Sequence, residues 1–183
     1  MATELDILKY VCQSLENANI HYMLTGSFAA NFYTVPRMTR DIDFVLEIFK
    51  FDVPRLYKVF QSDFYIDRDS IIQAIEQQGI FNIIHNDSII KIDFIVRKDS
   101  PYRNTEFERR RKIKVDNAEI WIVSPEDLII SKLFWAKDSL SQMQIKDVQN
   151  LMGTLNNLDM SYIQKWIKVL DLEHVYEKVK KDE

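Results

Sequence analysis

Hydrophobic positions near the start of the chain follow first the period of a helix and then that of a strand. Apolar residues between 5 and 15 recur at spacings of mostly three and four, which predicts an amphipathic helix with Thr3 as its N-cap. Residues 20–25 are rich in β-branched and aromatic side chains and predict a strand. Gly26-Ser27 follows, and then a helix-compatible run at 28–32. This order predicts a strand, a tight turn and a helix.

The middle of the chain predicts further strands separated by helices. Residues 41–48 form an apolar segment with Asp41 and Asp43 at alternate positions of its start. Two apolar runs, 80–85 and 89–96, are separated by three polar turn residues and predict a hairpin. The other predicted elements of this part are helices at 53–60 and 70–77 and a strand or hairpin at 115–123.

Helical spacing dominates the rest of the chain. Ser124 is a predicted N-cap, Pro125 suits the first helical turn, and the carboxylates at 126–127 complement the helix dipole. Four helices are predicted, at 128–135, 141–152, 162–170 and 173–179. We therefore expect an α/β fold in which a mixed β-sheet core (1–124) is flanked by helices and carries a C-terminal helical portion (125–183) packed on it.

Composition narrows the class of protein. The chain has 183 residues, 46% of them hydrophobic and 28% charged, which suits one globular core. Its start lacks a charged-then-apolar leader, and its longest stretch without a charged residue or histidine, 22–36, is shorter than the ~20 residues of a membrane span. A lone Cys12 favours a reducing compartment, so we expect a cytoplasmic protein without a membrane segment.

Charge argues against a general nucleic-acid binder, because a net charge of −4 supplies no global field for gripping polyanions. The concentrated basic tract is Arg109 to Lys112, extended by Lys114. It could hold RNA phosphates, but Glu106 and Glu108 dilute it, and a solvated charged face is the favoured interpretation. The three histidines are too dispersed for a zinc site, and no Ser-His-Asp order suggests a hydrolase.

Three carboxylates are the candidate chemical groups. Residues i and i+2 of a strand project from the same sheet face about 6.5–7 Å apart, so Asp41 and Asp43 would share a small volume. Asp93 lies in a second apolar strand and adds a third carboxylate if the two strands are neighbours. Burying such anions is costly, which makes a hard cation such as Mg²⁺ a natural partner. The alternative is solvated carboxylates, or carboxylates paired with Arg37 and Arg40.

A Gly-Ser turn upstream of these acids completes a pattern. Leu24-Thr25-Gly26-Ser27, then Asp41-Ile42-Asp43-Phe44, then Ile92-Asp93-Phe94 resembles the polymerase-beta-like nucleotidyltransferase superfamily over about residues 20–96. A narrower resemblance, to minimal bacterial nucleotidyltransferases including abortive-infection-type toxins, includes Arg37-x-Thr39 and Ser124-Pro125-Glu126-Asp127 with Lys132 and Lys146-Asp147. The resemblance implies transfer of a nucleoside monophosphate from an NTP to a hydroxyl of RNA, protein or a small molecule.

The same resemblance implies roles for the residues that match. Asp41 and Asp43 would bind Mg²⁺ or Mn²⁺, and Asp93 would complete a second metal position or act as general base. Gly26 and Ser27 would contact phosphate oxygens. The other nucleotide-binding candidates are Arg40 and Lys132, although Lys132 could instead extend to solvent.

Several functions stay open at this point. The chain could be one component of a toxin–antitoxin pair, with an antitoxin as partner. It could also be a catalytically weak nucleotide- or partner-binding module of the same fold, or a metal-dependent nuclease, since clustered aspartates also hydrolyse phosphodiesters. The Gly-Ser turn has no role in a nuclease. The preferred NTP, the acceptor and the oligomeric state cannot be read from the residues.

Overall fold

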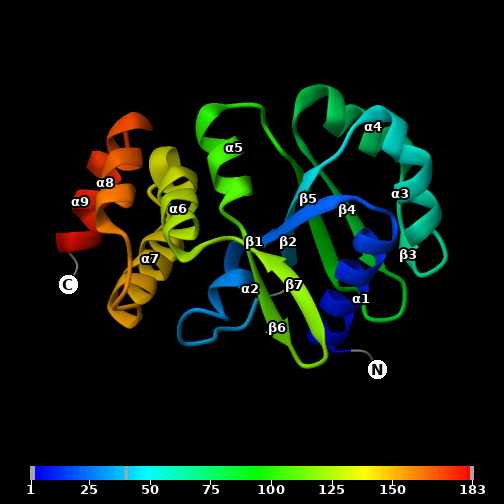
Figure 1. Ribbon diagram of the computed structural model, residues 1–183, viewed down its shortest axis with the longest axis horizontal. Coiled ribbons are helices and arrows are strands. Elements are labelled where there is room, and N and C mark those ends of the chain that lie inside the picture. Colours follow the sequence, from blue (N-terminus) through cyan, green and yellow to red (C-terminus); the bar gives the residue numbers. More distant parts are fainter. Residues whose placement is uncertain (1–2, 40, 182–183) are drawn as a thin grey trace.

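Seven strands form one mixed sheet in the computed structural model, which describes residues 3–39 and 41–181 (Figure 1). Their order across the sheet is β3-β4-β5-β2-β1-β7-β6. The strands are β1 (His21–Thr25), β2 (Asp41–Glu47), β3 (Phe64–Tyr65), β4 (Ile80–His85), β5 (Lys91–Val96), β6 (Arg111–Val115) and β7 (Ala118–Ile122). The predicted mixed sheet and the predicted hairpin of β4 and β5 are therefore confirmed.

Strand β2 occupies the centre and pairs differently on its two sides. It runs antiparallel to β1, with Thr25 opposite Asp43, and parallel to β5, with Asp43 opposite Asp93. Strand β1 is also hydrogen-bonded to β7 in parallel. The two strands that carry acidic residues are thus direct neighbours, and the turn after β1 lies beside them.

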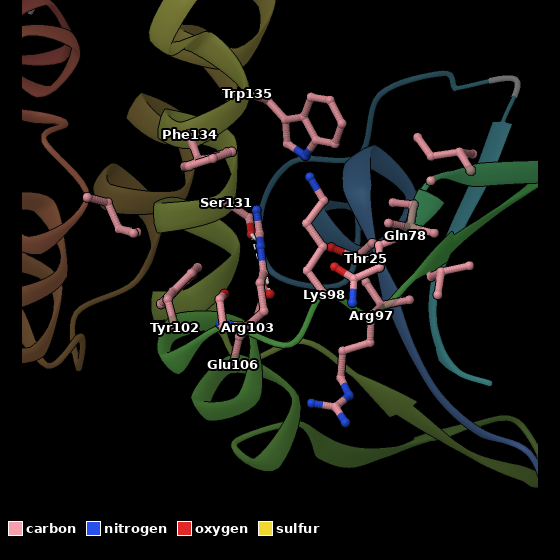
Figure 2. Close-up of a pocket in the computed structure, with 17 residues that line it drawn as sticks. Thr25, Gln78, Arg97, Lys98, Tyr102, Arg103, Glu106, Ser131, Phe134 and Trp135 are labelled. Atoms are coloured by element: carbon pink, nitrogen blue, oxygen red, sulfur yellow. Dashed lines mark hydrogen bonds and ion pairs between the residues drawn. The ribbon is translucent and has the colours of Figure 1, made fainter. Parts of the chain in front are cut away.

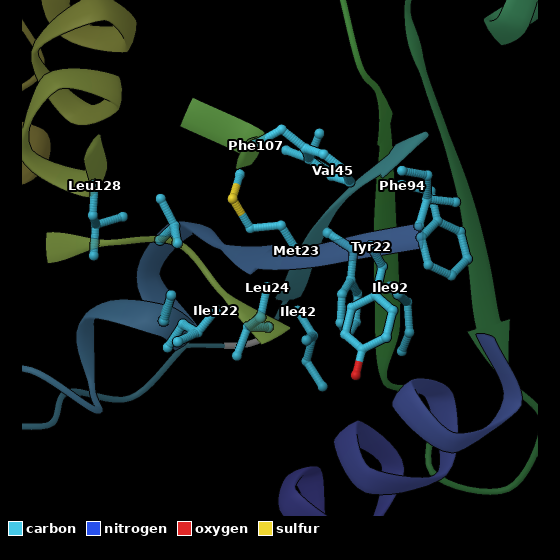
Figure 3. Packing of buried hydrophobic residues seen from close by; sticks show 14 of the residues in the cluster. Tyr22, Met23, Leu24, Ile42, Val45, Ile92, Phe94, Phe107, Ile122 and Leu128 are labelled. Carbon is cyan, nitrogen blue, oxygen red and sulfur yellow. The ribbon is translucent and has the colours of Figure 1, made fainter. Parts of the chain in front are cut away.

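Alternation along the central strands separates a wholly apolar, buried face from one that carries the acids. Ile42, Phe44 and Leu46 of β2 are buried, as are Ile92 and Phe94 of β5. The residues between them are mostly half-buried. Figure 3 shows Tyr22, Ile42 and Ile92 directed to one side of the sheet, whereas Met23 and Val45 lie on the other with Phe107. Both faces are therefore packed, and the period of two is the physical reason that the acids share a face with Val45 rather than with Ile42 and Phe44.

Helices lie on both sides of the sheet and extend the molecule at one end (Figure 1). The helical elements are α1 (Glu4–Asn17), α2 (Gly26–Ala30), the 3₁₀ helix η1 (Lys50–Asp52), α3 (Val53–Phe60), α4 (Arg68–Gln77), α5 (Pro101–Glu108), α6 (Pro125–Ser139), α7 (Gln142–Thr154), α8 (Met160–Val169) and α9 (Glu173–Lys181). Helices α1, α3 and α4 pack together on one side, and α6 to α9 gather near the C-terminus. In the described part of the chain, no helix is both long and apolar enough to cross a membrane.

Helix starts follow their capping residues. The Thr3 hydroxyl accepts a hydrogen bond from the Asp6 amide, and the Asp6 carboxylate accepts one from the Thr3 amide, forming a capping box. Ser124 likewise accepts from the Asp127 amide, with Pro125 in the first turn. Both predicted caps are confirmed. The boundary predicted between a core and a helical portion at residue 124 stays a prediction.

The basic tract is mostly exposed, as expected of a solvated charged face, and its side chains also make intramolecular contacts. Arg109 donates to Asp127 over 3.0 Å and stacks on the ring of Tyr162. Arg110 lies between the rings of Phe107 and Trp121. The other two members of the run pair with carboxylates: Arg111 with Glu126 and Lys112 with Glu119. The tract therefore keeps an exposed charged surface while it also contacts neighbouring elements.

Candidate active site

The two acidic strands bring their carboxylates to one side of the sheet. Asp43 and Asp93 are partners in the parallel register of β2 and β5, and Asp41 lies two residues before Asp43 on the same strand. Alternation therefore places all three on the same face. The expected shared face is present, while the gathering of the three carboxylates around one ion and the chemical role of each stay predictions.

Lys91 partly neutralises this group. It stands opposite Asp41 in the register, and its Nζ lies 2.8 Å from Oδ2 of Asp93 and 3.8 Å from Oδ2 of Asp41. It precedes Asp93 by two residues and so shares its face. Sequence reasoning missed Lys91, although the same period of two that relates Asp41 to Asp43 could have found it. The alternative in which Arg37 pairs with these aspartates is wrong, because Arg37 pairs with Asp147 and Lys91 contacts Asp41 and Asp93 instead.

Asp43 has the most perturbed environment of the three carboxylates. Burial raises the pKa of Asp43 to about 6, and the negative charges of Asp93 and Asp41 act in the same direction. Lys132 and Lys91 act in the opposite direction but do not cancel the effect. The charged form of Asp43 is therefore unfavourable in this site. A cation bound beside the carboxylates would stabilise it.

The start of α2 approaches the Asp43 carboxylate closely: the helix begins directly after β1 at Gly26, so the predicted Gly-Ser turn forms its first residues. Gly26 has a φ of +67°, and a Cβ placed on it would lie 2.0 Å from Oδ2 of Asp43. Only glycine leaves room for both the carboxylate and this backbone conformation. Thr25 precedes the helix without capping it through its side chain, so its hydroxyl leaves the first-turn amides of α2 to other acceptors.

Replacing Gly26 by alanine is expected to lower the free energy of unfolding by about 1–3 kcal/mol, because the new methyl group meets Asp43 and the φ is strained. Urea denaturation measures this change. The matched control is Gly153→Ala on α7, where a Cβ meets nothing within 4 Å and helix propensity should stabilise the protein by about 1 kcal/mol. Equal effects of the two substitutions would contradict the close approach at Gly26.

A buried ion network lies behind the turn. Lys132 on α6 is only 2% exposed, and its Nζ donates to Oδ2 of Asp147 on α7 over 2.7 Å and to Gln144 over 3.2 Å. Arg37 donates to both carboxylate oxygens of Asp147 over 3.0 Å, and its Nη2 donates to the Ser27 hydroxyl over 2.5 Å. This network links two C-terminal helices to the Gly-Ser turn.

The protonation of this network follows from its geometry. Burial lowers the pKa of Lys132, although the hydrogen bond to Asp147 opposes that effect. The pKa of Asp147 is also lowered, because its bonds to Arg37 and Lys132 outweigh its burial. Two cations around one carboxylate leave a local positive charge beside the turn, so the network suits an anionic ligand.

A cavity of about 230 Å³, here called the acid-lined cavity, lies between the carboxylates, the start of α2 and Lys132. It is lined by Thr25, Gly26, Ser27, Asp43, Ile80, Asp93, Ile95, Leu128, Ser131, Lys132, Trp135 and Gln144. Carboxylates therefore lie on one wall, the turn on another, and the buried ammonium on the α6 side. The cavity can accept a molecule that carries both phosphate groups and a cation.

Five of the predicted site residues line this cavity: Gly26, Ser27, Asp43, Asp93 and Lys132. Asp41 is not among the lining residues, although it lies two residues before Asp43 on β2, and Arg40 lies outside the described residues. The alternative in which Lys132 extends to solvent is wrong, because α7 covers it.

Sequence reasoning assigned no site role to Gln144, Ile80 or Trp135, and it included Asp147 only in the narrower resemblance. The spacing of three between Gln144 and Asp147 is a usable signal for a shared helix face. No local pattern shows which element that face packs against.

Within residues 3–39 and 41–181, no group of three or more acidic, histidine or cysteine side chains is gathered tightly enough to hold a metal ion as it stands. Two contacts fit this absence. The ammonium of Lys91 is paired with the Asp93 carboxylate, and the side chain of Asp41 is 48% exposed. The donors are nonetheless all carboxylate oxygens, the type that hard divalent cations prefer.

No protein-family model matches the sequence, and no curated protein matches it either. Several solved structures share the fold. A nucleotidyltransferase-like antigen from Paracoccidioides brasiliensis is 18% identical with a TM-score of 0.60, covering 95% of this chain and 92% of that one. The lincosamide adenylyltransferase LnuA, bound to lincomycin, is 14% identical with a TM-score of 0.57, covering 84% and 99%.

ANT(2″)-Ia in complex with adenylyl-2″-tobramycin gives a TM-score of 0.61 at 12% identity, covering 94% of this chain and 99% of that one. Coverage is nearly complete in both directions, so the likeness includes the C-terminal helices as well as the sheet. At such low sequence identity, the likeness supports a shared backbone fold and says nothing of the chemistry. The chain therefore has the α/β fold of nucleotidyltransferases.

Proposed function

We propose that the chain transfers a nucleoside monophosphate from an NTP to a hydroxyl group of an acceptor. The observation that carries this proposal is the in-register pairing of Asp43 with Asp93, beside a glycine turn that leaves room for no side chain. A nuclease needs the carboxylates alone, whereas a transferase also needs a holder for phosphate. The turn and the Arg37–Asp147–Lys132 network supply one.

A divalent cation, Mg²⁺ or Mn²⁺, fits the carboxylates. Burial raises the pKa of Asp43 and the charges of Asp93 and Asp41 add to the shift, so a bound cation would stabilise its charged form; the ligands would be Asp41, Asp43 and Asp93. When bound, the ion would neutralise charge on the triphosphate. Lys91 is partly exposed and flexible, so it can leave Asp93 when a stronger cation arrives.

The residues of the chain would then position and deprotonate the acceptor. The acceptor hydroxyl oxygen attacks the α-phosphorus, and its proton passes to the Asp93 carboxylate. The bond between the α-phosphorus and the bridging oxygen breaks, and its electron pair leaves with pyrophosphate. Asp93 suits this role because it lines the acid-lined cavity next to Asp43.

Phosphate oxygens of the NTP would bind on the opposite wall. The amides of Gly26 and Ser27 can approach them closely, since no side chain intervenes at Gly26. Lys132 would add a fixed positive charge in a water-poor setting, where electrostatic attraction is stronger. Asp147 acts through Lys132 and Arg37 and is a positioning residue.

The test is to incubate the purified protein with each α-³²P-labelled NTP, Mg²⁺ or Mn²⁺, and cellular RNA, protein or small-molecule extracts. We expect labelled product and an equal amount of pyrophosphate, both lost when EDTA removes the metal. NTP binding by calorimetry without pyrophosphate release from any extract would favour the binding-module function. Cleavage of RNA without NTP would favour a nuclease.

A role as a toxin–antitoxin component stays a prediction from the sequence resemblance alone. Labelled RNA or protein in the same experiment, together with growth arrest on expression, would support it. A labelled small molecule without growth arrest would instead place the chain among enzymes that modify small hydroxylated compounds.

A further inference from the structure

A second cavity, here called the apolar cavity, adjoins the first and is larger. Its volume is about 340 Å³, within the range of roughly 300–1,000 Å³ typical of small-molecule sites. The two cavities share the lining residues Thr25, Ile80, Ile95, Ser131 and Trp135. Ile95 follows Asp93 by two residues on β5, so the two side chains lie on one face about 6.5–7 Å apart. A molecule in the apolar cavity can thus reach the carboxylate.

Apolar side chains make up much of this second wall. Val45, Ile80 and Ile95 contribute from the sheet, while Phe134 and Trp135 contribute from α6 (Figure 2). Ile80, Phe134 and Trp135 are 51%, 40% and 54% exposed, although they could bury this surface against a flat ligand. Exposed aromatic surface gathered around a cavity is typical of a binding site.

The charged residues around the apolar cavity are mainly basic. Three of the lining residues are basic, namely Arg97, Lys98 and Arg103. One is acidic, namely Glu106. Glu106 is only 2% exposed and already accepts hydrogen bonds from Arg103 and Ser131, so it cannot receive a ligand cation without losing them. No lining carboxylate is therefore available to bind a cationic ligand.

Lys98 supplies the available charge. Arg97 pairs with Glu47 over 2.6 Å and Arg103 with Glu106 over 2.7 Å, whereas Lys98 is exposed and has no carboxylate within ion-pair distance in the described part of the chain. Figure 2 shows its side chain extending toward the indole of Trp135. A positive group at the edge of an aromatic wall complements a ligand that is flat and negatively charged.

We propose that the apolar cavity binds the hydroxyl acceptor, and that this acceptor is an anionic aromatic small molecule. The assignment as acceptor rests on the proposed transfer function. The ring would lie between the α6 aromatics and Ile80 and Ile95, with its anionic group toward Lys98 and its hydroxyl toward Asp93. A polyamine acceptor would find no free carboxylate among the residues that line the apolar cavity and is therefore disfavoured on charge.

Two fluorescent probes that share their rings but differ in charge test the site directly. They are 8-anilinonaphthalene-1-sulfonate, which is an anion, and N-phenyl-1-naphthylamine, which is neutral. Phe134→Ala is expected to weaken both probes about tenfold, because it removes an aromatic wall. Lys98→Glu is expected to weaken the anion roughly fivefold and leave the neutral probe unchanged.

Matched controls lie on the other side of the sheet or far from the cavity. Lys58→Glu reverses an exposed charge on α3, and Phe51→Ala removes an exposed ring in η1. Both should leave the two affinities unchanged. Unchanged anion binding in Phe134→Ala and Lys98→Glu, or equal loss in the controls, overturns the proposal.

Competition identifies the ligand class. The acceptor analogues 4-hydroxyphenylacetate, tyrosol and tyramine carry one phenol with an anionic, neutral or cationic tail, and the first should displace the anionic probe at the lowest concentration. Displacement by tyramine at a lower concentration overturns the proposal. An equal loss of MgATP and probe affinity in Phe134→Ala also overturns it, because the cavity would then hold the nucleobase.

The two proposals fail separately. Asp43→Asn should abolish transfer yet retain the probe affinities, since Asp43 does not line the apolar cavity. Absent NTP binding with normal probe binding would contradict the proposed transferase alone. Normal transfer with probe affinities that ignore Phe134 and Lys98 would contradict the acceptor site alone.

Discussion

Asn in place of Asp43 is expected to reduce the rate of nucleotidyl transfer on the order of 10³-fold or more. The carboxylate lies at the centre of the acidic group, in register with Asp93 and against the Gly26 turn. Metal coordination by such a group contributes several kcal/mol to the transition state, and each 1.36 kcal/mol is about tenfold in rate. The measurement is labelled product per minute from α-³²P-labelled NTP.

The melting temperature of Asp43→Asn distinguishes a loss of catalysis from a loss of folding. Because burial and like charge raise the pKa of Asp43, its charged form destabilises the folded state at neutral pH. That penalty is absent below the ordinary carboxyl pKa and grows as the pH rises through it. The Asp43→Asn side chain carries no charge, so the melting temperature of this variant should equal or exceed that of the unaltered protein.

The control is Asp87→Asn, which removes an exposed carboxylate from the loop between β4 and β5. It should change neither activity nor melting temperature. Persistent labelling by Asp43→Asn would remove this residue from the mechanism. A melting temperature well below that of the control would show that the substitution acts on folding instead.

Alanine in place of Asp147 is expected to lower the free energy of unfolding by about 3–5 kcal/mol, because it leaves a buried ammonium without its carboxylate. Lys132 is 2% exposed and Asp147 is 5% exposed, so water cannot replace the lost partner. Arg37 loses both of its carboxylate contacts in the same change. Urea denaturation of purified proteins measures the effect.

Two further variants test the cause. Glu177→Ala removes the carboxylate of an exposed pair with Lys180 and should cost no more than about 1 kcal/mol. The double substitution Lys132→Met with Asp147→Leu removes both buried charges and should recover most of the stability. A cost for Asp147→Ala no greater than that of Glu177→Ala would contradict the buried network.

Most of the fold could be predicted because its elements have strong periodicity. Helix α3 begins and ends where the pattern predicted, and β4 and β5 form the predicted hairpin. Helix α5 was missed, since its sequence is mostly polar and its apolar positions are few. Ser100 and Pro101 were a usable signal, because Ser caps this helix and Pro occupies its first turn. Strand β3 has two residues and no readable pattern.

The candidate site divides in the same way. Asp41 and Asp43 share a face because of strand geometry, and Gly26 can begin α2 directly after β1 because glycine tolerates a positive φ. These are local properties that a few neighbouring residues set. The resemblance to nucleotidyltransferases depended on such short motifs.

Contacts between distant segments were decided only on folding. The register that puts Asp93 against Asp43, the ammonium of Lys91 between the acids, and the burial of Lys132 against Asp147 each join residues far apart in the chain or on different elements. The energies of these contacts depend on how deeply each side chain is buried and on which residue it meets. Neither property follows a periodic pattern along the sequence. Local pattern therefore set which side chains each element presents, while packing set which of them meet, how they are charged and what they can bind.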